Sequence, residues 1–156
     1  MVRYKESRIE PLQSLSKTAS QIENIVDGDG RVKGAKTYYD SVVNTNGENL
    51  AAVRNASATR DKEYQRLEKL NKGLIKARSE GKNTEGFEAL IKVQTEACDK
   101  ADANVENVRK QEIAKAFQDF RQVRIERANE LRQEDSNMAA LFEQYENGLN
   151  EVISNS

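Results

Sequence analysis

Two aspartates and a glycine near residue 30 have the spacing of a calcium-binding loop. An EF-hand loop needs oxygen ligands at positions 1, 3, 5 and 12 and a glycine at position 6. Asp27, Asp29 and Gly30 fit positions 3, 5 and 6. Position 1 then falls on Ile25 and position 12 on Lys36, so one carboxylate is missing and a cation replaces the bidentate glutamate. Because each glycine also disfavours helix by about 1 kcal/mol, the stretch favours a break between helices over a calcium site.

The side chains that most often carry catalysis are scarce. The chain has no histidine, the commonest general base and zinc ligand, and one cysteine, Cys98. Cys98 falls in the apolar pattern of a predicted helix, which favours a small buried hydrophobe over a reactive thiol. We therefore expect no enzyme, no cofactor and no metal site.

The composition favours long helices. Of 156 residues, 33% are charged and 37% are hydrophobic, with one proline and no tryptophan. This profile is typical of helices packed along a narrow apolar seam. The sequence predicts an all-α fold, an elongated antiparallel long-helix hairpin or coiled coil that turns near Gly81. It forms one domain over 1–156, with helices at 2–26, 32–79 (weakened or broken near 44–49) and 84–153.

Apolar residues in the last predicted helix recur every three or four positions. This rhythm predicts a seam that is either a core or a dimer interface. Its members are Val105, Val108, Phe117, Phe120, Met138, Phe142 and Tyr145. A lone hairpin with so narrow a stripe buries little surface, so we expect a homodimer.

Charge is distributed unevenly although the net charge is only −1. Basic residues cluster around the predicted turn and again on the last helix, whereas 133–156 contains acids and no bases. Clusters of this kind bind anionic membranes or are simply a solvated helix face. Nucleic acid binding is not expected, because the overall balance is acidic and no aromatics interleave with the basic residues. The predicted lipid-binding residues are Lys69, Lys72, Lys76, Arg78, Lys82, Arg121 and Arg124.

The N-terminus, "MVRYKESRIE", lacks the apolar core of a signal peptide, and no window is apolar enough to span a bilayer. A single cysteine agrees with a reducing compartment. We expect a cytoplasmic protein, with peripheral membrane attachment through its basic clusters.

Two stretches resemble BAR domains. "RIEPLQSLSKTASQIENIV", Arg8 to Val26, is similar to the part of the second BAR helix in which Pro-Leu follows an acidic residue. Three further pieces follow in the order found in BAR domains: "TRDKEYQRLEKLNKG" (Thr59 to Gly73), a basic tip, and the segment from Val105 to Leu149. The last segment resembles a final BAR helix, with Phe117 and Phe120 in Phe-x-x-Phe.

Within BAR proteins, the chain is most similar to the Chibby-interacting BAR-domain family. That resemblance implies a crescent-shaped dimer that remodels membranes near ciliary basal bodies with a Chibby-type partner. The expected function is a BAR-like membrane-associated scaffold that binds anionic lipid. The alternative is a coiled-coil adaptor or structural protein that binds a helical protein partner without lipid.

Overall fold

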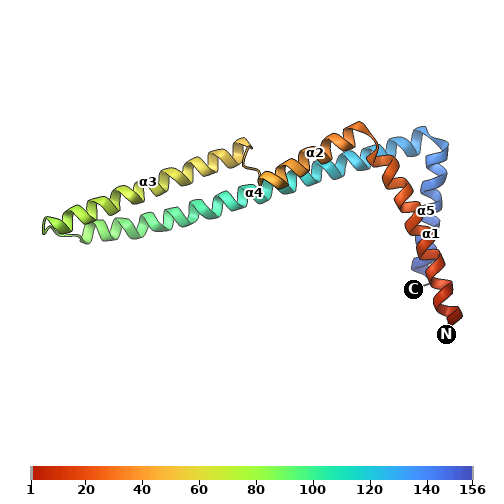
Figure 1. The fold of residues 1–156 in the computed structure, drawn as a ribbon, viewed down its shortest axis with the longest axis horizontal. Coiled ribbons are helices and arrows are strands. Elements are labelled where there is room, and N and C mark those ends of the chain that lie inside the picture. Colours follow the sequence, from red (N-terminus) through yellow and green to blue (C-terminus); the bar gives the residue numbers. More distant parts are fainter. Residues whose placement is uncertain (1, 156) are drawn as a thin grey trace. The chain divides into compact units, whose positions relative to one another are not determined.

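The structure, a computed structural model, describes the backbone of residues 2–155 and the side chains from Leu12 onward. These residues form five helices and no strand (Figure 1), which confirms the predicted all-α class. The helices are α1 (Val2–Asp27), α2 (Gly30–Thr45), α3 (Ala51–Ser79), α4 (Glu85–Glu134) and α5 (Ser136–Ser154).

Contacts divide the chain into two compact units, where the sequence predicted one domain. Unit 1 consists of Met1–Tyr39 and Phe117–Ser156, and unit 2 of Asp40–Ala116. Both α2 and α4 therefore contribute residues to each unit, and each unit is described by itself below.

The calcium-like stretch is the corner between α1 and α2 in unit 1. Asp29 Oδ1 accepts hydrogen bonds from the backbone N–H of Arg31 (3.0 Å) and of Val32 (3.3 Å). This is N-cap geometry, in which an aspartate oxygen satisfies amides that the first helical turn leaves free. Asp29 thus explains why α2 starts where it does.

A second aspartate divides the segment that the sequence predicted as one helix over 84–153. Asp135 adopts an extended backbone (φ −123°, ψ 112°), and its carboxylate accepts from the amides of Asn137 (2.9 Å) and Met138 (3.3 Å). A cap of this kind is worth about 1 kcal/mol. The apolar rhythm continues across the break, which is why periodicity alone missed it.

Left-handed backbone marks the two turns of unit 2. Between α2 and α3, Asn46 (φ 54°) and Gly47 (φ 70°) reverse the chain within the stretch expected to be weak. The amide of Gly47 donates to the carbonyl of Val42 at 2.8 Å and so closes the end of α2. Gly81 (φ 68°) has the same role after α3, because glycine adopts this conformation without a Cβ penalty.

Unit 2 is built from the end of α2, from α3 and from the first part of α4, and α3 and α4 run antiparallel (Figure 1). The side-chain amide of Gln94 donates to the carbonyl of Glu63 (2.8 Å) and to its carboxylate (2.7 Å). Gly73 permits the close approach, since a Cβ there would lie 2.5 Å from a ring carbon of Phe87. The buried residues of these helices are Val53, Ala56, Ala77, Cys98, Val105 and Ala116.

Unit 1 has its own apolar core, in which α1 packs beside α5 (Figure 1). Gly148 of α5 faces Leu15 of α1. The central buried residues are Val26, Val32, Leu131 and Met138, and Ile22, Phe120, Val123, Ala128, Leu141 and Phe142 pack against them. Several predicted seam residues therefore lie in this core.

Candidate functional site

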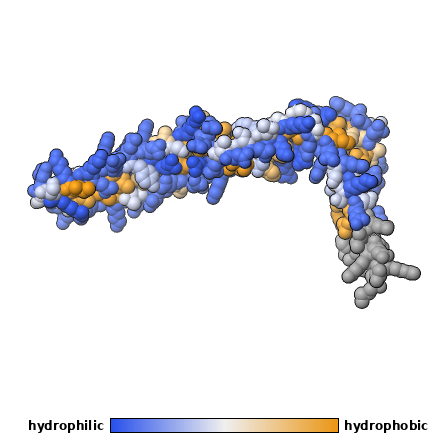
Figure 2. Space-filling view, in the orientation of Figure 1, coloured by the Kyte–Doolittle hydropathy of each residue, from blue (hydrophilic) through white to orange (hydrophobic). Residues whose placement is uncertain are grey.

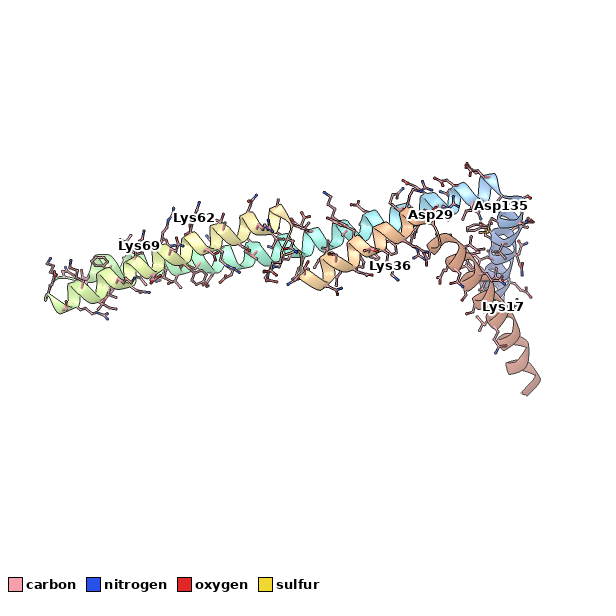
Figure 3. The ribbon with its side chains drawn as sticks, turned by 45° about the horizontal axis from the view of Figure 1, so that its top comes forward. Lys17, Asp29, Lys36, Lys62, Lys69 and Asp135 are labelled. Carbon is pink, nitrogen blue, oxygen red and sulfur yellow. The ribbon has the colours of Figure 1, made fainter. Side chains whose placement is uncertain are left out.

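The unit 2 hairpin holds most of the predicted lipid-binding residues. Lys69 and Lys76 are exposed and form no ion pair with any described residue. Lys62, one heptad before Lys69, shares both properties, and Figure 3 shows Lys62 and Lys69 projecting from α3. Residues one heptad apart lie on the same side of a helix, so these lysines form a row.

Three other predicted residues of unit 2 are paired with carboxylates. The pairs are Lys72–Glu68 at 3.2 Å, Arg78–Glu88 at 3.5 Å and Lys82–Glu80 at 2.8 Å. All three pairs are solvent-exposed, and such pairs contribute little stability. Their cations remain available to an anionic partner, but each is offset by a neighbouring acid.

The two predicted arginines of α4 belong to unit 1. Arg124 pairs with Asp27 at 3.0 Å, and its guanidinium lies 5.5 Å from the centre of the Phe120 ring. Arg121 is exposed and makes no ion pair within the described chain. Arg124 therefore has a role in the fold of unit 1, whereas Arg121 is a free surface cation.

Contacts across the hairpin show which sides of α3 and α4 meet. Tyr64 donates to the carboxylate of Asp102 at 2.6 Å, and Arg78 pairs with Glu88 on the same edge. The bond to Asp102, and then burial, raise the pKa of Tyr64, because the bond favours the neutral phenol. We call this side the mixed edge; it holds Asp61, Glu68, Glu88, Asp99, Asp102 and Glu106, with Arg54, Arg78, Lys92 and Arg109.

The opposite edge of the hairpin carries no acid from Asn55 to Lys76 of α3 or from Gly86 to Asn107 of α4; Glu80, one heptad after Gly73, lies just past the end of α3. Helical spacing places on it the residues that flank the seam on the side away from Tyr64. We call it the lysine edge; it consists of Asn55, Thr59, Lys62, Arg66, Lys69, Gly73 and Lys76 on α3 and Gly86, Leu90, Val93, Ala97, Lys100, Asn104 and Asn107 on α4. Arg66 pairs at 2.9 Å with Glu63, a seam residue. The lysine edge is therefore a cationic surface on which Lys62, Lys69, Lys76 and Lys100 are unpaired.

Sequence reasoning did not single out Lys62, Lys100 or Val93, and it counted Leu90 only within the apolar rhythm of the last helix, whereas Leu90 is 55% exposed. The heptad spacing of Lys62, Lys69 and Lys76 could have predicted that these lysines lie on one side of a helix. The edge itself needs the pairing of α3 with α4, which only the contacts across the hairpin supply.

Cys98 is 1% exposed within the unit 2 seam. Burial raises the pKa of its thiol, and a hydrogen bond from Gln94 opposes this only in part. A reactive cysteine needs a lowered pKa and access, so this thiol has a packing role.

The aspartates of the corner between α1 and α2 serve the fold of unit 1. Asp29 Oδ2 lies 3.3 Å from Arg127 Nε, an ion pair without hydrogen-bond geometry, and Asp27 pairs with Arg124. Glu130 extends the network with two hydrogen bonds from Arg31, at 3.1 Å and 2.5 Å. The two carboxylates that fit the calcium spacing are thus paired with guanidinium groups, and the stretch forms a capped corner between two helices.

Unit 1 should lose stability in acid because of this network. Burial raises the pKa of Asp29, but bonds from the amides of Val32 and Arg31 and the charges of Arg31 and Arg127 bring it below 3.8. The bond from Arg31, against some burial, likewise brings the pKa of Glu130 below 4.5. A carboxyl with a lowered folded pKa stabilises the fold above its unfolded pKa and loses that contribution as pH falls through the folded one.

We therefore expect the free energy of unfolding of the wild type, measured with urea, to decrease as pH falls below about 4.5. The variant Asp29→Asn should be less stable at neutral pH and should show a shallower acid dependence. Equal slopes for the two proteins would contradict the assignment.

The predicted seam residues are buried mainly within the chain. Val105 is fully buried in unit 2, and Met138 is buried in the core of unit 1. Phe120 and Phe142 pack against that core, and Val108 and Tyr145 are half-buried. Phe117 is 44% exposed and its ring centre lies 5.6 Å from that of Tyr39. The sequence predicted that these residues form either a core or a dimer interface, and most of them pack in the cores of the two units.

Among the described residues, no helix has both the length and the apolar character needed to cross a bilayer. No protein-family model, no curated protein and no solved structure matches the chain.

Proposed function

We propose that this chain is a membrane-associated scaffold that binds anionic lipid surfaces through the lysine edge of unit 2. The observation that carries the proposal is a row of unpaired lysines, Lys62, Lys69 and Lys76, with Lys100 beside it, on an edge whose one acid at the tip, Glu80, is paired with Lys82. Each Lys or Arg near an anionic leaflet gains about 1 kcal/mol, so these side chains together support reversible binding. The carboxylates of the mixed edge then face away from the lipid.

The predicted homodimer of BAR type belongs to the same proposal. Each unit has a small core, and self-association would bury further apolar surface. Light scattering of the full chain should report twice the 17.6 kDa of one chain. A measured mass equal to that of a single chain would exclude the dimer and would leave the lipid-binding proposal unaffected.

Co-sedimentation with vesicles tests the lipid proposal. We expect the wild type to pellet with phosphatidylserine-containing vesicles at low salt, not with pure phosphatidylcholine, and to be released by high salt. The variant Lys62→Glu/Lys69→Glu/Lys76→Glu should lose most of this binding, because it reverses the charge of the row.

A charge-matched control separates the edge from net charge. Lys17, Lys33 and Lys36 are exposed lysines of unit 1 without ion pairs among the described residues, and Lys17 and Lys36 are labelled in Figure 3. The variant Lys17→Glu/Lys33→Glu/Lys36→Glu should bind close to wild-type level. Equal losses in both triple variants would show that only net charge matters. A wild type that ignores anionic vesicles would favour the adaptor that binds a helical protein partner.

A further inference from the structure

The lysine edge also carries exposed aliphatic side chains. Leu90 is 55% exposed and Val93 is 65% exposed, although both belong to well-packed unit 2. Residues three apart are neighbours on a helix surface, and Ala97 continues the same side of α4 one turn further. In Figure 2, apolar atoms gather on unit 2 near the α3–α4 turn. Single exposed aliphatics are ordinary, but an adjacent pair on an edge rich in lysines is not; the acid that borders the pair on α4 is Glu96, three residues after Val93.

The position of Leu90 and Val93 follows from the seam of α4. Gln94 faces α3, as its hydrogen bonds to Glu63 show, and Asp102 marks the mixed edge through Tyr64. At about 100° per residue, Leu90 and Val93 fall on the side of the seam opposite Asp102. Their neighbours across the hairpin are then the α3 residues of the lysine edge.

We propose that Leu90 and Val93 insert into the headgroup and upper acyl region of an anionic bilayer while the surrounding lysines bind its phosphates. This inference rests on the proposed function and adds the depth and orientation of the bound hairpin. Lysines suit this arrangement, because their alkyl stems lie along apolar surface while the ammonium groups remain at the headgroups.

Charge complementarity selects the bilayer as the occupant of this face. A partner must present anions around an apolar centre, since the edge has four unpaired lysines and only two acids at its border, Glu80 and Glu96. An anionic leaflet has this layout, with phosphates in one plane and hydrocarbon directly below it. A protein partner with an acidic rim is the alternative that the experiment must separate.

A single introduced tryptophan reports the insertion, because the chain has none of its own. In Val93→Trp, we expect the emission to shift to the blue on adding phosphatidylserine vesicles and to be quenched by brominated acyl chains. The control is Ile75→Trp: Ile75 is 67% exposed and lines a shallow groove with Tyr64 and Glu68 on the mixed edge. It should show neither effect. Leu90→Trp repeats the test at the neighbouring position if Val93→Trp does not fold.

The outcomes distinguish this inference from the proposed function. If the wild type does not bind vesicles, both fail. If it binds and the tryptophan at 93 stays unshifted and unquenched, insertion is wrong while electrostatic binding stands. If the tryptophan at 75 responds equally, the hairpin has no preferred side and the orientation is wrong.

Salt dependence gives an independent reading. The variant Leu90→Ser/Val93→Ser keeps every charge, so it should still bind at low salt and lose about tenfold in affinity where high salt screens the lysines. If high salt reduces the vesicle affinity of the wild type and of the variant to the same degree, the inference is wrong.

Discussion

Replacing Leu131 by Ala should destabilise unit 1 by about 2–5 kcal/mol. Leu131 is 9% exposed and lies in the same core as Val26, Val32 and Met138. This core closes the corner between α1 and α2 and the corner between α4 and α5. Truncation leaves a cavity between helices whose ends are fixed by the caps at Asp29 and Asp135, so the site cannot collapse freely.

The matched control for Leu131→Ala is Ile125→Ala on the same helix. Ile125 is 43% exposed, and a surface truncation of this kind usually changes stability by less than about 0.5 kcal/mol. Chemical denaturation followed by circular dichroism gives the free energies, and hydrogen exchange shows whether the lost protection lies in unit 1. Equal effects of the two variants would contradict the assignment of this core.

The corner at Asp27 to Gly30 shows what sequence reasoning can and cannot supply. Glycine content and the missing end ligands were enough to predict a helix break instead of a calcium site. The function of Asp29 was not predictable, because its oxygens serve the amides of Arg31 and Val32 and the guanidinium of Arg127, a residue distant in sequence. Local patterns show where a helix stops, but a contact between distant segments needs the fold.

The break at Asp135 was missed for a related reason. Long helices are predicted from apolar periodicity and from the absence of glycine and proline. The stretch around Asp135 has neither residue, and its only signal is an aspartate placed to accept from the amides of Asn137 and Met138. Many aspartates in this acidic chain have the same local appearance, so the signal is too weak to choose one.

The sequence predicted a cluster of basic residues, but it could not predict which of them share one surface of the hairpin. The basic cluster around Lys69 and Lys76 is visible in the sequence, but so are Lys72, Arg78 and Lys82, which the structure pairs with acids. The distinction depends on which edge of the hairpin each side chain occupies. That in turn depends on the pairing of Tyr64 with Asp102, two residues on different helices.

Replacing Val105 by Asp should unfold unit 2 or destabilise it by several kcal/mol. Val105 is 0% exposed at the seam between α3 and α4, in a unit whose other most buried residues include Val53 and Cys98. A carboxylate there would lose its water, and the cation one turn later, Arg109, already pairs with Glu106. A buried charge without a dedicated partner is among the costliest of substitutions. Tyr64 cannot compensate, because it already donates to Asp102.

Ala103→Asp separates burial from the helix propensity of aspartate. Ala103 lies on the exposed side of α4, two residues from Val105, so the same new side chain meets water there. Propensity alone costs less than about 1 kcal/mol, and the control should therefore remain folded. Circular dichroism and thermal unfolding of both variants provide the comparison. If Val105→Asp were as stable as Ala103→Asp, the antiparallel seam on which the lysine edge depends would be wrong, and the vesicle experiments would need another explanation.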